Sequence, residues 1–189
     1  MTGKTHQIVG ITAGLGFYLT QVEPTYSPAT LAAVLVGSHL AALLPDLDNS
    51  AADFWHSLPF GHAAGKIVDP LIKHRNFTHS IFGLGLAGIG LNYLFTFFPA
   101  YWGINANVVF IAMLVSYASH LFSDMFTVEG IPLLWPYKRM FGVPPKPFHS
   151  FRVMTGKWFE NLVIFPLVNV SLIVLIISQW QTIKTILFK

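Results

Sequence analysis

The chain has 189 residues, of which 53% are hydrophobic and only 10% charged, and its formal net charge at pH 7 is +3. A soluble domain carries about 25% charged residues, so this composition excludes an ordinary soluble protein. It indicates a single integral-membrane domain over residues 1–189. There is no cysteine, which excludes disulfides and thiolate metal sites. Any metal would need histidine and carboxylate ligands, a set that favours zinc, manganese, magnesium or iron.

Five apolar segments predict membrane helices. In chain order they are residues 8–20, 28–44, 81–98, 108–126 and 162–180. A spanning helix needs about 20 apolar residues, and the last four segments reach or approach that length. The first is shorter and lacks a cleavage site of the signal-peptide kind, so we expect it to be retained as a short span or a re-entrant helix. The predicted fold is an all-α, polytopic membrane bundle of four to five transmembrane helices.

Basic residues predict the orientation of this bundle. If all five segments span, the N-terminus and the two long connections, residues 46–79 and 127–157, lie on one face. That face carries nine of the eleven lysines and arginines, whereas the other face carries only Lys184 and Lys189. The positive-inside rule makes the nine-residue face cytoplasmic.

Histidines and carboxylates gather at the segment ends on this same face. They are His6, Asp46, Asp48, His74, His79, His120, Asp124, Glu129 and Glu160. Polar ionisable groups at a membrane segment are costly unless they have partners or a function. We therefore predict a polar metal site at the cytoplasmic interface.

Spacing supports a metal site in particular. His120 and Asp124 are four residues apart, so on a helix they project from the same face, one turn apart. A histidine and a carboxylate in that relation can share one metal ion. Asp46 and Asp48 flank a single residue, which lets two carboxylates of one turn bind the same ion or bridge two.

Structural roles compete with each of these assignments taken singly. Asp46 and Asp48 could end a helix after Pro45, and Thr78 or Ser80 could cap the N-terminus of the third segment. For the deeper His39 we favour a hydrogen bond to a neighbouring helix. Structural roles explain less well why histidines and carboxylates from several segment ends would all lie at the same membrane depth.

Three motifs resemble the YdjM-like family of predicted inner-membrane, metal-dependent hydrolases. They are His39-x6-Asp46-Leu47-Asp48, His74-Arg75-x-x-Thr78-His79-Ser80, and His120-x3-Asp124 followed by Glu129-Gly130-Ile131-Pro132. The resemblance extends from about residue 5 to residue 160. It implies a prokaryotic cytoplasmic-membrane enzyme with a divalent metal ion. By matching motif it implies five metal ligands, Asp46, Asp48, His79, His120 and Asp124, with His6 and Glu160 at further polar positions.

The first functional hypothesis is a hydrolase acting on a lipid-linked or amphiphilic substrate, with phosphoester chemistry favoured by the basic residues. One or two ions of zinc, manganese or magnesium would activate water, and His6 would complete the ligand set. Glu129 or Glu160 is a candidate general base and His74 a candidate acid. The candidate contacts to an anionic headgroup are Arg75, Lys138, Arg152 and Lys157.

Other hypotheses belong to different classes. A metal-free phosphatase with a histidine nucleophile would contain a pair similar to His120-x3-Asp124. The arginine expected upstream of that pair is absent from this sequence. A non-enzymatic metal sensor or carrier is the main alternative, although transport ligands are expected near the bilayer midplane. Basic loops that only bind anionic lipids would leave the aspartates unexplained. No motif indicates nucleic-acid binding.

Overall fold

A computed structural model describes residues 1–21, 27–48, 77–97, 103–137 and 139–188. Within these residues the fold is all-helical and contains no β-strand, only two isolated bridges, Thr127 with Val153 and Ile131 with Phe141. The α-helices are α1 (Gly3–Leu19), α2 (Pro28–Ala41), α5 (Ile81–Phe95), α6 (Ala106–Asp124), α7 (Phe165–Ser178) and α8 (Trp180–Leu187). The predicted fold class is confirmed in this respect.

Local sequence signals set the starts of three helices. The hydroxyl of Ser27 accepts a hydrogen bond from the Thr30 amide, and Pro28 occupies the first turn of α2, where a proline costs no hydrogen bond. Ser80 caps α5 through the Gly83 amide, and Asn105 caps α6 through the Val108 amide. Such caps stabilise a helix by about 0.5–2 kcal/mol.

Short helical turns adjoin the helices that matter for the site. The 3₁₀ turn η1 (Leu44–Asp48) follows α2, and η2 (Phe77–His79) precedes α5. A π-helical turn, η5 (Glu160–Ile164), leads into α7. The turn η4 (Phe148–Phe151) lies in the connection between α6 and α7.

Helix α6 is the centre of the bundle and packs against α1, α2 and α5. Small residues allow α1 and α2 to approach closely: a Cβ atom added at Gly10 would collide with Ala42, and one added at Gly14 would collide with Ser38. Glycines at this four-residue spacing are typical of helix contacts within membranes. The α1–α2 seam therefore depends on the absence of side chains at Gly10 and Gly14.

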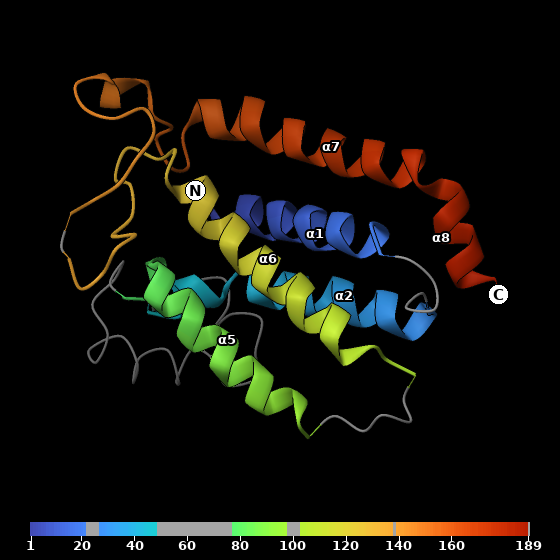
Figure 1. Ribbon diagram of the computed structural model, residues 1–189. Coiled ribbons are helices and arrows are strands. Elements are labelled where there is room, and N and C mark those ends of the chain that lie inside the picture. The colour runs from blue at the N-terminus through green and yellow to red at the C-terminus, as the bar shows by residue number, and fades with distance from the viewer. Residues whose placement is uncertain (22–26, 49–76, 98–102, 138, 189) are drawn as a thin grey trace, which may run out of the picture.

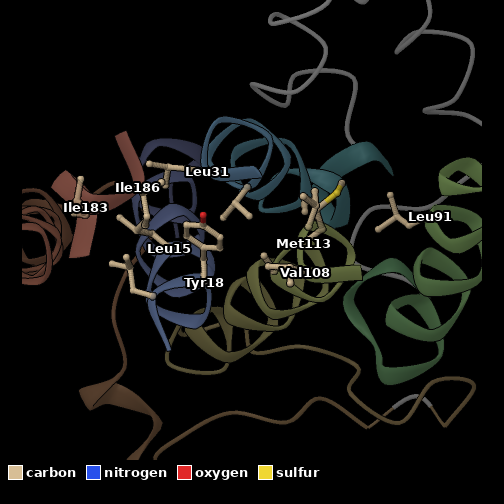
Figure 2. Close-up of a cluster of buried hydrophobic side chains, with 13 residues drawn as sticks. Leu15, Tyr18, Leu31, Leu91, Val108, Met113, Ile183 and Ile186 are labelled. Atoms are coloured by element: carbon tan, nitrogen blue, oxygen red, sulfur yellow. The ribbon is translucent and has the colours of Figure 1, made fainter. Parts of the chain in front are cut away.

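The apolar core lies between α1, α2 and α6, and α8 closes one end of it (Figure 2). Ile183 and Ile186 of α8 are buried in the same cluster as Leu15, Tyr18 and Leu31. The fifth predicted apolar segment, residues 162–180, included the first residue of α8, Trp180. In the structure the chain leaves the α7 helix at Gln179, and α8 begins at Trp180.

Two helical segments in the described part of the chain are long and apolar enough to cross a membrane, Ala106–Asp124 and Glu160–Ser178. Half of the first is buried inside the protein, whereas no residue of the second after Glu160 is buried. Helices α1, α2 and α5 have 17, 14 and 15 residues, below or at the edge of the usual spanning length. The count of four to five spans therefore stays a prediction.

Candidate metal centre

Five of the predicted ligands lie together at the end of the bundle where α1 begins and α6 ends (Figure 1). His6 comes from the first turns of α1, and His120 and Asp124 come from the last turns of α6. Asp46 lies in η1 and His79 ends η2. They form two triads, His6–His120–Asp124 and Asp46–His79–His120, and within each triad the ligand atoms lie within 4.8 Å of one another.

The three histidine Nε2 atoms point at the two carboxylates. His6 Nε2 lies 3.1 Å from Asp124 Oδ1, and His79 Nε2 lies 3.4 Å from Asp46 Oδ1. Asp124 Oδ2 is 3.8 Å from Nε2 of both His79 and His120. Asp124 thus presents one oxygen to each side of the cluster, and Oδ1 also contacts the nitrogen of Met1.

Hydrogen bonds to the other ring nitrogens orient two of the imidazoles. His120 Nδ1 lies 2.7 Å from the carbonyl oxygen of Ala42 and can only donate to it. Ser123 Oγ donates to the His120 carbonyl at 2.9 Å, so it must accept from His6 Nδ1, 3.0 Å away. The Ala42 bond holds His120 in the tautomer with a lone pair on Nε2, as in metal-bound histidines. The Ser123 bond would hold His6 in the same tautomer when its Nε2 binds a metal.

Burial makes this arrangement unfavourable without a cation. His6, His79, His120 and Asp124 are at most 2% exposed, and the rings of His6 and His120 stack with centroids 3.6 Å apart. Two protonated rings at that separation would repel each other. His120 Nε2 is fully buried without a hydrogen-bond partner in the described residues, which is costly for a polar atom. The donor set therefore fits a divalent metal ion.

Asp46 is the exception, since its side chain is 20% exposed. Partial burial alone would raise the pKa of Asp46. Its electrostatic interactions with the nearby His120 and His79 act in the opposite direction and hold the pKa below its ordinary value. Asp46 is therefore an ionised carboxylate at neutral pH and is available as a ligand.

Glu160, the first residue of η5, directs its side chain to the start of α1 but is not part of either triad. Its Oε1 accepts hydrogen bonds from the Thr2 amide at 2.6 Å and from the Thr5 hydroxyl at 2.7 Å, and its Oε2 accepts one from the Gly156 amide at 2.7 Å. Because Thr5 precedes His6, these bonds fix the turn that carries a ligand. The geometry gives Glu160 a positioning function.

Glu129 and Arg152 lie in the connection after α6, where both line a cavity of about 700 Å³. Arg152 donates from Nε to the Pro144 carbonyl at 2.7 Å and from Nη2 to the Gly142 carbonyl at 2.9 Å. Its guanidinium therefore holds the fold of this loop. Lys157 is exposed and lies three residues before η5, the turn that leads into α7.

Four predicted positions lie outside what the structure describes. His74, Arg75 and Lys138 fall outside the described residues, as does the side chain of Asp48, whose backbone belongs to η1. Their predicted roles stay predictions.

Two orienting groups were not predicted from the sequence. Ser123 lies one helical turn after His120 and immediately before Asp124, a position that could have drawn attention to it. The Ala42 carbonyl is a backbone group, so no residue type in the sequence indicates its role. It is available to His120 because α2 ends at this point and Ala42 is its C-cap.

The comparisons with known proteins agree with this picture. The chain matches the family model described as YdjM inner membrane protein over residues 1–187. It is 31% identical over 152 residues to the Inner membrane protein YdjM of Escherichia coli (strain K12), covering 76% of this chain and 70% of that protein. The Shigella flexneri protein of the same name gives the same figures. YvsG of Bacillus subtilis (strain 168) is 30% identical over 167 residues, 87% of this chain and 88% of that protein. No solved structure matches.

The all-helical bundle, its exposed apolar helices and the names of these relatives define a helical membrane protein with a buried cluster of histidines and aspartates. The chain belongs to the YdjM family.

Proposed function

We propose that this protein is a membrane-bound, metal-dependent hydrolase that cleaves a phosphoester of a lipid-linked or otherwise amphiphilic substrate. The observation that carries the proposal is the buried convergence of three histidine Nε2 atoms on two carboxylates. The ligand atoms come from four separate elements of the chain, so local helix structure alone does not bring them together. A donor set of nitrogen and oxygen suits zinc, manganese or magnesium.

His6, Asp46, His79, His120 and Asp124 hold one or two divalent ions in this proposal, and Asp48 stays a predicted further ligand. A divalent ion supplies Lewis-acid activation of water and of a phosphoryl oxygen. Asp124 serves both triads, because its Oδ1 faces His6 and its Oδ2 faces His79 and His120. Asp46 marks the accessible side, since it is the most exposed of the five.

Proton transfer requires a further group near the reacting water. Both oxygens of Glu160 already accept hydrogen bonds, so we assign it to positioning the start of α1. Glu129 keeps the predicted role of general base and His74 that of acid.

The cavity beside Glu129 suits an anionic headgroup. Arg139, Lys146 and Arg152 outnumber Glu129 in its lining, and a cleft with an excess of positive charge concentrates anionic ligands. Arg152 acts here by shaping the loop. Lys157 of the same connection and, in our prediction, Arg75 and Lys138 would add positive charge on this side of the bundle.

A multi-pass topology with this cluster at the cytoplasmic face of the inner membrane completes the proposal. The ends of α2 and α6 and the starts of α1, α5 and α7 lie on one side of the bundle (Figure 1), which is the arrangement expected if all five helices cross. The excess of lysine and arginine in the connections at that side supports a cytoplasmic orientation.

The proposal is tested by elemental analysis and lipid hydrolysis on the same preparations. We expect the purified protein to contain a stoichiometric divalent metal and to release phosphate-bearing products from a bacterial lipid extract. His120→Ala should lose both, whereas His39→Ala, which changes a histidine of α2 that belongs to neither triad, should keep both. Full activity in the presence of a chelator would contradict the metal mechanism. Metal without any hydrolysis would favour a sensor or carrier.

A further inference from the structure

An apolar groove lies beside the metal centre, between α5, η1 and α6. It has a volume of about 430 Å³, within the range of roughly 300–1,000 Å³ that is typical of small-molecule sites. The lining is almost wholly hydrocarbon and includes Leu44, Leu47, Leu86, Gly90, Leu94 and Tyr117. This groove is separate from the basic cavity beside Glu129, with which it shares no lining residue.

One face of α5 forms the long wall of the groove. Gly83, Leu86, Gly90 and Leu94 line the groove. They are spaced by three or four residues and therefore lie on the same face of the helix. A Cβ atom added at Gly90 would meet nothing within 4 Å, whereas one added at Gly83 would collide with the backbone of Phe77 and Thr78. The groove is therefore closed by η2 near Gly83 and open at Gly90.

The closed end of the groove adjoins the metal centre. Leu44 and Leu47 line the groove and flank Asp46 in η1, and Thr78 lines it next to His79. Tyr117 of the same lining donates a hydrogen bond to the Thr78 carbonyl. Asp46 is also the most exposed of the five ligands. A molecule lying in the groove would thus have one end at the accessible side of the cluster.

The length of the groove matches one lipid chain. From Gly83 to Leu94 the helix rises by about 16 Å, at 1.5 Å per residue. The hydrocarbon core of a bilayer is about 30 Å thick, so this wall is as long as the hydrocarbon part of one leaflet. Most of the outer surface of α5 is exposed apolar side chain, including Phe82, Ile89 and Tyr93, which allows lateral entry from lipid.

We propose that this groove holds the hydrocarbon chain of a phosphate-bearing lipid substrate while its headgroup lies against Asp46 and the metal centre. The inference rests on the proposed hydrolase function, which it extends by naming the substrate as a membrane lipid whose chain is bound by the protein. The chain is then recognised by the groove, and the headgroup alone is not sufficient for binding.

Two glycines of α5 provide a matched test. Gly85 and Gly90 both have open space where a Cβ atom would stand, but only Gly90 lines the groove. The protein is reconstituted in nanodiscs with phosphatidic acid that carries a photoactivatable group in one acyl chain, and labelled residues are mapped by mass spectrometry. We expect labelling on the Gly90 face of α5 and on Tyr117. Gly90→Leu should lower it about tenfold, equivalent to about 1.4 kcal/mol of binding free energy, and Gly85→Leu should not.

The metal content of each preparation separates the two proposals. Equal labelling of both faces of α5, or no effect of Gly90→Leu, would overturn the groove assignment even if the protein contains metal. Loss of metal in Gly90→Leu would also overturn it, because the glycine would then serve the packing of the metal centre. A metal-free wild-type protein that still shows the labelling pattern would overturn the hydrolase proposal instead.

Discussion

Helices α6 and α7 look alike in the sequence but have opposite roles in the structure. Both belong to 19-residue helical segments that are long and apolar enough to cross a membrane. Half of the α6 segment is buried and it carries His120 and Asp124, whereas the α7 segment has no buried residue after Glu160 and exposes Leu167, Val170 and Ile177. Hydropathy therefore does not separate the two helices, but the ionisable residues distinguish the helix that carries the histidine–aspartate cluster from the one with an exposed apolar surface.

The largest effect in testing this difference between α6 and α7 is expected from removing the charge of Asp124. Asp124→Asn keeps the size of the side chain but removes the charge that faces His6, His79 and His120. We expect bound metal and hydrolysis to fall to background, measured by elemental analysis and product release. The control is Asn161→Ala, since the Asn161 side chain donates to the Gly156 carbonyl and, among the described residues, contacts no ligand of the cluster. Retained metal in Asp124→Asn would contradict the assignment of α6 as the site helix.

A charge on α7 should affect insertion and leave the site intact. Val170→Arg places a cation on a helix surface that is exposed to lipid in our topology, at a cost of about 2.5–3.5 kcal/mol at the bilayer centre. The membrane-inserted fraction should fall, as measured by membrane extraction, with unchanged metal content per inserted molecule. Val170→Leu serves as the control. Normal insertion of Val170→Arg would mean that this face of α7 does not contact lipid.

Two serines of α6 sharpen the comparison within one helix. Ser123 accepts the hydrogen bond that orients His6, whereas the Ser119 hydroxyl, among the described residues, bonds the Ser116 carbonyl and no ligand. Removing a hydrogen-bond partner of a ligating histidine typically lowers metal affinity by about 10–100-fold. We expect Ser123→Ala to show a loss of that size in a metal titration and Ser119→Ala to bind as the wild type does. Equal affinities would refute the orienting role of Ser123.

The smallest expected effect is that of mild acid. The pKa of Asp46 is held below its ordinary value of 3.8, so this carboxylate stays ionised at any pH above that value. Histidine and carboxylate ligands must be deprotonated to bind metal, so protons compete with the ion. Metal affinity should therefore fall as the pH is lowered, as measured by titration at several pH values. Affinity that does not change with pH would argue against histidine and carboxylate ligands.

The sequence predicted the helical class and four helix starts to within three residues, because apolar length and capping serines are local properties. It also predicted that His6, Asp46, His79, His120 and Asp124 would gather on one side of the bundle, since alternate segment ends share a face, and the structure brings these five side chains together. Their common depth in a membrane stays a prediction. It did not predict the hydrogen bonds that saturate Glu160 or engage Arg152. Those bonds join backbone groups far apart in the chain, so no spacing pattern reveals them.

The break between α7 and α8 was not predicted for a related reason. Residues 162–180 form one apolar run, and hydropathy does not show where such a run bends. The structure turns after Ser178 because Ile183 and Ile186 are buried against α1 and α2. The contact that decides the turn lies beyond the end of the apolar run.

The close contact of Gly10 with Ala42 ties the packing of two helices to the chemistry of the cluster. Ala42 also presents the carbonyl that accepts from His120 Nδ1. A larger residue at Gly10 would push this carbonyl away from the imidazole without touching any donor atom. In a mutational screen for metal loss, Gly10 would therefore score alongside the ligands although it has no side chain to offer a metal. The set of residues on which the geometry of the cluster depends thus extends into the seam between α1 and α2.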